Sequence, residues 1–117
     1  MKPPREKPFP NEKAFQTAAM ARIRDYGGEP YHPIGTGATK KGTPDILACV
    51  PGRIVVGRFV ACELKQPGEK PTPLQFKRLR DYAAAGALAG WATTEVELDW
   101  LLSHIDDTAW VNPQLAR

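Results

Sequence analysis

Three charged residues stand at the ends of two apolar segments, where they could act together. Asp45 opens "DILACV", and Glu63 and Lys65 close "RFVACELK". Successive side chains of a strand point to opposite faces, so Glu63 and Lys65 share one face while Leu64 between them faces the core. If the two segments pair as strands, the carboxylate of Asp45 comes close to that of Glu63.

The chemistry of such a group follows from its charges. Two carboxylates repel each other by about 4 kcal/mol at ~4 Å when the effective dielectric constant is ~20. A divalent cation removes this repulsion, and an oxygen-rich site with water ligands suits Mg²⁺ or Mn²⁺. The backbone carbonyl of Leu64 could add a ligand, and the ammonium of Lys65 could orient a nucleophile or stabilise a pentavalent phosphate. The group therefore predicts phosphodiester hydrolysis.

A plainer interpretation is a surface ion pair between Glu63 and Lys65, with Asp45 as a turn residue after Pro44. An acid and a lysine two residues apart are common in proteins, so this pair alone indicates nothing. The apolar strands and the "GTPD" start of the first one favour the metal site.

The rest of the sequence predicts the elements that would position these residues. Asn11 can cap a helix that runs to about Tyr26 and stops at a glycine pair. "YHPIG" predicts a short edge strand and the two apolar segments predict longer ones, with "RIVVG" between them as a third strand or the arm of a hairpin. Thr72 and Gln75 have the spacing of a capping box for a helix to about Ala85.

"ALAGWAT" predicts a further strand, and Thr94 and Glu97 repeat the capping-box spacing before an amphipathic helix to Ile105. The order α-β-β-β-α-β, plus a C-terminal helix, predicts one α/β domain. We expect a basic, proline-rich arm over residues 1–10, the domain over 11–105 and a tail over 106–117.

Composition limits the possible classes of protein. The 117 residues suffice for one modest core, and no apolar run approaches the ~20 residues of a membrane span. No signal peptide is visible, so we expect an intracellular, cytoplasmic protein. Cys49 and Cys62 are expected to be free, reduced and buried, because a zinc site needs more ligands than the chain groups together. The net charge of +3 is compatible with a polyanionic partner.

The motifs resemble a known group of enzymes. "PD" at 44–45 and "ELK" at 63–65 match the PD-(D/E)XK nuclease superfamily, and "EKAFQ…GTPDILA…FVACELKQPGEKPTPLQFKRLRDYAAAG" resembles the virus-type replication–repair nuclease (VRR-NUC) family. The resemblance implies a restriction-endonuclease-like core, a small mixed sheet flanked by helices, and cleavage of DNA that depends on Mg²⁺ or Mn²⁺. It makes Asp45 and Glu63 metal ligands and Lys65 catalytic.

The same resemblance adds Glu12 of "NEKAF" as a metal ligand and Gln75 of "TPLQ" as a catalytic residue. Each has a structural alternative. An acid in the first turn of a helix interacts favourably with the helix dipole, and Gln75 completes the capping box with Thr72.

DNA phosphates are expected to be bound by basic residues near the site. The candidates are Lys40, Lys41, Lys70, Lys77 and Arg78, with Arg5 and Lys7 of the arm. No element for reading bases is visible, so we expect structure-selective cutting. No small-molecule cofactor and no membrane partner are expected.

The resemblance to viral and phage members implies branched DNA, four-way (Holliday) junctions or flaps, in repair or recombination. A junction has two strands to cut, which suggests a homodimer, with Trp100 or Trp110 at its interface. The alternatives are a branched-DNA-binding module without catalysis and an RNA-cleaving relative of the same fold.

Overall fold

The computed structural model describes residues 9–34 and 40–116, so the predicted arm lies largely outside the described residues. Its centre is a four-stranded sheet in the order β1-β2-β3-β4. The first three strands pair antiparallel, and β4 runs parallel to β3, which requires the crossover that a helix between them provides. The strands are β1 Glu29–Tyr31, β2 Ile46–Val50, β3 Arg58–Leu64 and β4 Leu88–Ala92.

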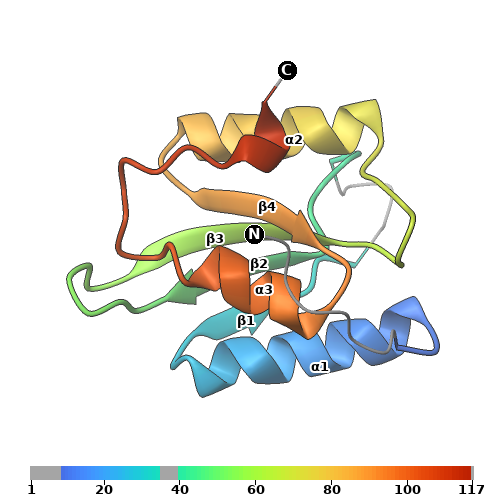
Figure 1. Cartoon of the computed structure of the whole chain (residues 1–117), viewed down its shortest axis with the longest axis horizontal. Coiled ribbons are helices and arrows are strands. Elements are labelled where there is room, and N and C mark those ends of the chain that lie inside the picture. Colours follow the sequence, from blue (N-terminus) through green and yellow to red (C-terminus); the bar gives the residue numbers. More distant parts are fainter. Residues whose placement is uncertain (1–8, 35–39, 117) are drawn as a thin grey trace.

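Helices cover both faces of this sheet. Figure 1 shows α1 (Glu12–Asp25) and α3 (Glu95–Leu102) on one side and α2 (Pro73–Ala84) on the other. A short 3₁₀ helix, η1 (Pro113–Leu115), lies next to α2. The predicted α/β class, the element order and the mixed sheet are confirmed. The edge strand β1 lies earlier than the predicted "YHPIG", with which it shares only Tyr31.

The two faces have different cores. The larger core packs Phe15 and Ile23 of α1 and Leu98 of α3 against the face of β3 that carries Val60 and Leu64. The smaller core, on the α2 side, consists of Ala61, Leu79 and Ala89 with half-buried neighbours that include Trp91. Both faces of β3 are therefore covered, and Glu63 faces the α2 side with Ala61.

Local capping signals fix where the helices begin. The Asn11 side chain accepts a hydrogen bond from the Ala14 N–H at 2.8 Å. The Thr72 hydroxyl accepts from the Gln75 N–H at 3.2 Å, and the Gln75 side-chain oxygen accepts from the Thr72 N–H at 2.8 Å. The predicted starts of α1 and α2 are thus confirmed, including the full capping box of α2.

The start of α3 differs in one detail from the prediction. The Thr94 hydroxyl accepts from the Glu97 N–H at 3.1 Å, as expected. The Glu97 carboxylate, however, accepts from the N–H of Thr93 at 2.7 Å and from its hydroxyl at 2.8 Å. It therefore anchors the end of β4 instead of closing a second capping box. The helix also ends at Leu102, earlier than predicted.

The segment "RIVVG" is neither a strand nor a hairpin arm; that prediction is wrong. Residues 51–57 form the loop that joins β2 to β3, with Ile54 and Val56 strongly exposed. The carboxylate of Asp106 accepts hydrogen bonds from the backbone N–H groups of Arg53, Ile54 and Val55 at 2.9, 2.8 and 3.0 Å. These donors are consequently not available to a neighbouring strand.

The chain after α3 covers the open edge of β4. Asn112 donates to the Ala89 carbonyl at 2.9 Å, and Gln114 accepts from the Trp91 N–H at 3.1 Å and donates to the Trp91 carbonyl at 2.8 Å. Side chains thus replace the strand that would otherwise pair there. Trp100 and Trp110 also pack edge to face with each other and against the larger core.

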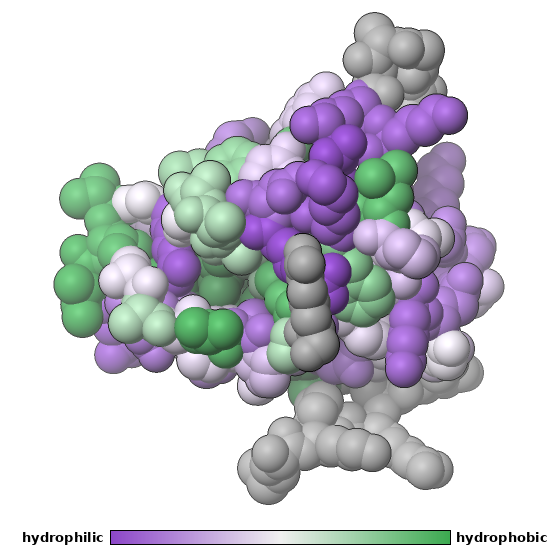
Figure 2. All heavy atoms as spheres, turned by 90° about the horizontal axis from the view of Figure 1, so that it is seen from above, coloured by the Kyte–Doolittle hydropathy of each residue, from purple (hydrophilic) through white to green (hydrophobic). Residues whose placement is uncertain are grey.

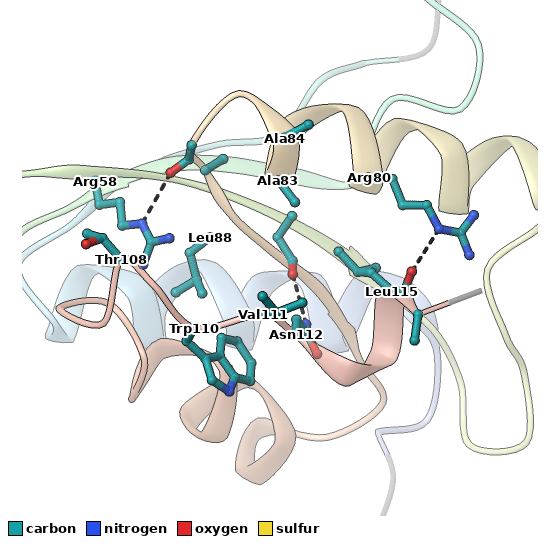
Figure 3. Close-up of a pocket in the computed structure, with 14 residues that line it drawn as sticks. Arg58, Arg80, Ala83, Ala84, Leu88, Thr108, Trp110, Val111, Asn112 and Leu115 are labelled. Atoms are coloured by element: carbon teal, nitrogen blue, oxygen red, sulfur yellow. Dashed lines mark hydrogen bonds between the residues drawn. The ribbon is translucent and has the colours of Figure 1, made fainter.

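Two arginines fasten this C-terminal part to the rest of the protein. Arg58 donates to the carbonyl oxygens of Gly86, His104 and Ile105 at 3.4, 3.1 and 3.3 Å. Arg80 donates to the Leu115 carbonyl at 2.9 Å. In Figure 3 they stand at opposite ends of a cavity of about 320 Å³. None of the predicted site residues lines this cavity.

The cysteines agree with the prediction in one respect. Both are free, and Cys62 is buried, which raises the pKa of its thiol above the usual range. Cys49 is exposed, so the expectation that both would be buried is wrong. In the described residues, no helix is both long and apolar enough to cross a bilayer.

Candidate active site

Asp45 is held immediately before β2 by contacts on two sides. Its carboxylate oxygen Oδ2 accepts a hydrogen bond from the Leu64 N–H at 2.8 Å. Its backbone carbonyl lies 2.8 Å from Nδ1 of the His32 ring. Since Ile46 pairs with Cys62 across the sheet, Asp45 stands beside Glu63. The predicted approach of the two carboxylates is therefore present, fixed by strand register and by one backbone hydrogen bond.

Glu63 is more deeply placed than its position near a strand end suggests. The residue is only 2% exposed, and its Oε2 atom is buried without a hydrogen-bond partner. The pKa of Glu63 is raised to about 9, chiefly by burial, then by a hydrogen bond with Asp45 and by the negative charge of Asp45. The positive charge of Lys65 acts in the opposite direction. Without a cation, the pair retains a proton at neutral pH.

This pair fits a hard divalent cation. Mg²⁺ is commonly bound by one or two carboxylates, with waters and substrate phosphates completing its coordination. The unpaired, buried Oε2 of Glu63 is an oxygen that such an ion would satisfy. Among the described residues, no three acidic, histidine or cysteine side chains group closely enough to hold an ion by themselves. The donor set is thus two carboxylates rather than a complete protein cage.

Glu12 is not part of this close group. It is the first residue of α1, it is exposed, and its charge makes the smallest contribution to raising the pKa of Glu63. The structure therefore shows the position near the helix N-terminus that the dipole favours. Its role as a metal ligand stays a prediction.

Lys65 and Gln75 lie at the start of the connection to α2 and on its first turn. Lys65 continues the β3–β4 ladder through its N–H, which donates to the Ala92 carbonyl at 2.9 Å, and its side chain is half-buried. The side-chain oxygen of Gln75 serves the capping box. Only its amide N–H groups remain for a contact with phosphate, so the catalytic role of Gln75 stays a prediction.

The candidate phosphate-binding residues differ in exposure and in whether an acidic side chain pairs with them. Lys40, Lys41 and Lys70 are exposed. Lys77, also exposed, pairs with Asp81 at 2.9 Å. Seen from the α2 side in Figure 2, hydrophilic residues occupy most of the centre and right of the surface, and apolar residues gather toward the left.

Arg78 has a structural task that the sequence did not indicate. Its guanidinium donates to the Lys41 carbonyl at 3.1 Å and pairs with Asp81 at 3.4 Å. It therefore fastens to α2 the segment that carries Lys40 and Lys41, called the basic loop below. With Lys40 and Thr43 it lines a hollow of about 300 Å³. It thereby holds in place the loop that leads to Asp45.

Trp91 is a residue at this site that sequence reasoning missed. It is the partner of Glu63 in the pairing of β3 with β4, and its indole Nε1 is buried without a hydrogen-bond partner. A single tryptophan in a predicted strand indicates only a core residue. Its proximity to Glu63 depends on the parallel register of β4, which the sequence does not specify.

Comparison with known proteins shows which family this chain resembles in fold and in sequence. A solved structure described as "VRR_NUC domain" superposes with a TM-score of 0.63 at 24% identity, over 80% of this chain and 95% of that one. The fold is therefore that of a nuclease domain. "Putative nuclease p44" of Acyrthosiphon pisum secondary endosymbiont phage 1 is 35% identical over 77 residues, which are 66% of this chain and 73% of that protein. No family model matches the chain. The chain belongs to the VRR-NUC family of the PD-(D/E)XK nucleases.

Proposed function

We propose that this protein is an endonuclease that hydrolyses phosphodiester bonds in DNA with Mg²⁺ or Mn²⁺. The observation that carries the proposal is the contact between Asp45 and Glu63, with a buried, unpaired oxygen on Glu63 and Lys65 on the same face. A cation is the partner that such a pair lacks. Membership of a nuclease family supports the reaction class.

Each residue of the candidate active site has a proposed role. Asp45, Glu63 and the Leu64 carbonyl would hold the ion, with Glu12 as an additional ligand. A divalent cation bound there would polarise the phosphate and acidify a water molecule. The ammonium of Lys65 would orient the attacking water and offset the charge that develops on the phosphate. The amide of Gln75, at the N-terminus of α2, would contact a phosphate oxygen.

The proposed substrate is branched DNA, a four-way junction or a flap, met inside a bacterial or phage-infected cell during repair or recombination. Lys40, Lys41 and Lys70 carry the exposed charge for the phosphate backbone, with Lys77 and Arg78 as weaker contributors because both pair with Asp81. None of these contacts selects a base. The relative named as a phage nuclease supports this setting.

We also propose a homodimer, because the described residues of one chain offer one such buried carboxylate pair while a junction requires two cuts. Trp100 and Trp110 use much of their apolar surface within the chain, so any interface through them would involve only their exposed edges. Light scattering that gives a monomer at micromolar concentration, with junction cutting intact, would exclude the dimer.

The central experiment is cleavage of a substrate panel with Mg²⁺, with Mn²⁺ and with a chelator. The panel contains duplex, single strand, flap and four-way junction, each also made in RNA. We expect cleavage of a branched DNA that requires the added metal. Binding without cleavage under every condition would identify a non-catalytic DNA-binding module, and preferential cutting of RNA would identify an RNA-cleaving relative.

A further inference from the structure

Two buried side-chain atoms in the described part of the chain have no hydrogen-bond partner. They are Oε2 of Glu63, an acceptor, and Nε1 of Trp91, a donor. Buried polar atoms in folded proteins are almost always paired, so each unpaired one calls for an explanation. An unpaired donor and an unpaired acceptor in the same small region explain each other if they interact in the functional state.

The strand register places these two side chains together. Glu63 and Trp91 are partners in the parallel pairing of β3 and β4, so both project from the face that α2 covers. Side chains at paired positions on one face of a sheet are neighbours on adjacent strands. No group in the described residues bonds the indole N–H. The backbone of Trp91, in contrast, is bonded on both sides by Gln114.

Trp91 is fixed in a way that suits a positioning residue. Gln114 bonds both its backbone N–H and its carbonyl, at 3.1 and 2.8 Å, which locks this end of the edge strand. The ring packs with the smaller core of Ala61, Leu79 and Ala89. The donor is therefore presented by a rigid element, on the strand position that pairs with Glu63.

We propose that Trp91 positions Glu63 for metal binding: its indole N–H donates to the Glu63 carboxylate, directly or through one water, when that carboxylate holds a divalent cation. The inference rests on the proposed function. A carboxylate has about four acceptor sites. An ion and Trp91 would occupy different ones, and the tryptophan would fix the orientation of the group. Partners of this kind typically change metal affinity by about 10–100-fold when they are removed.

The test is metal binding by the full chain without DNA, measured by calorimetry with Mn²⁺ and with Mg²⁺. Trp91→Phe keeps an aromatic ring and removes the N–H; we expect its dissociation constant to rise about tenfold or more. Trp110→Phe is the matched control, because that ring packs with Trp100 and His104 instead, and its affinity should equal that of the wild type. Circular dichroism and the melting temperature verify that each variant is folded.

A second measurement does not depend on how Trp91→Phe folds. The chain has three tryptophans, so the double variant Trp100→Phe/Trp110→Phe leaves Trp91 as the sole indole fluorophore. We expect Mg²⁺ to shift its emission, and Glu63→Gln in that background to abolish the shift.

The outcomes separate the two proposals. Metal binding that is equal in wild type and Trp91→Phe, or emission that is unchanged while calorimetry detects binding, overturns the role of Trp91 and leaves the nuclease proposal standing. A wild type that binds neither ion overturns the role of Trp91, and the nuclease proposal falls with it if the substrate panel also shows no metal-dependent cleavage.

Discussion

Lys65 is the residue whose proposed chemistry is easiest to isolate, because it lies beside the carboxylate pair without being a proposed metal ligand. Lys65→Ala removes the charge that would orient the water and stabilise the phosphate. We therefore expect the cleavage rate to fall by about 10²-fold or more, with binding of the same DNA retained. Single-turnover cleavage and a gel-shift titration measure the two quantities.

Lys13→Ala is the control. Lys13 is an exposed lysine of α1 and belongs neither to the candidate active site nor to the lysines and arginines proposed to bind phosphates. Undiminished cleavage by Lys65→Ala, with the control also active, would refute the catalytic role of Lys65. A parallel loss in both variants would indicate a general effect of charge.

Glu63 makes the stability of the metal-free protein depend on pH. Its pKa rises from 4.5 in the unfolded chain to about 9 in the folded one, so the folded state binds the proton more tightly. The stabilisation is complete below pH 4.5 and is lost as the pH rises toward 9. Glu63→Gln has no charge to bury. With a chelator at pH 8–9, its melting temperature should exceed that of the wild type by about 5 °C or more.

The same scans with Mg²⁺ provide the second half of this prediction. An ion that binds only the folded state should raise the melting temperature of the wild type at pH 8 and leave that of Glu63→Gln unchanged. Equal pH profiles of the two proteins in chelator would contradict the buried, proton-holding carboxyl.

The sequence anticipates part of this site for a definite physical reason. Strand alternation and one antiparallel pairing suffice to bring Asp45 near Glu63, and both are visible in the chain itself. The burial of Glu63 and the neighbouring indole of Trp91 could not be predicted. Both depend on where α2 and β4 lie relative to β3. The residues around Glu63 in the sequence do not determine the position of α2 or of β4.

At the scale of elements, α2 combines a structural and a proposed catalytic task in Gln75. Thr72 and Gln75 both belong to the capping box, but only Gln75 is a candidate for a contact with phosphate. Thr72→Ala and Gln75→Ala should each destabilise the protein by about 1 kcal/mol through the lost cap. If Gln75 also acts on the substrate, its variant alone should show a lower cleavage rate at a temperature where both proteins are folded.

The comparison is made with thermal melts and single-turnover rates of the two variants side by side. Equal rates would assign Gln75 to the cap alone. A loss in both would mean that the position of the helix end, rather than the glutamine itself, matters for cleavage.

Elements that depend on local signals are those that the sequence predicts well. The caps of α1 and α2 are bonds between residues three apart, so the pattern contains both partners. "RIVVG" has the composition of a strand, yet Asp106, about fifty residues later, binds its backbone N–H groups and makes it a loop. A distant partner of this kind overrides β-propensity, which depends strongly on context.

Considered as a whole molecule, the protein carries a modest net charge of +3, so DNA binding depends on where its cations lie. Many of them serve the fold. Arg58 and Arg80 bond backbone carbonyls, and Arg78 holds the basic loop against α2. The number of basic residues therefore overstates the positive charge that can contact a phosphate backbone. The exposed lysines before Asp45, Lys40 and Lys41, should account for a large share of DNA binding.

This distribution predicts a difference between lysines. Each lysine that contacts a phosphate contributes about 0.9 to the slope of log affinity against log salt on duplex DNA. The double variant Lys40→Ala/Lys41→Ala should lower the magnitude of that slope by up to ~2 and weaken binding. Lys77→Ala should change it far less, because Lys77 lies 2.9 Å from Asp81, which already compensates its charge.

The measurement is fluorescence anisotropy of a labelled four-way junction between about 50 and 200 mM salt, the range in which phosphate contacts change affinity strongly. A chelator prevents cleavage during the titration. Asp81→Ala completes the comparison: it removes the partner of Lys77 and Arg78 and should steepen the salt dependence. Equal slopes for the loop variant and the wild type would place the DNA on another face, away from the approach to Asp45 and Glu63.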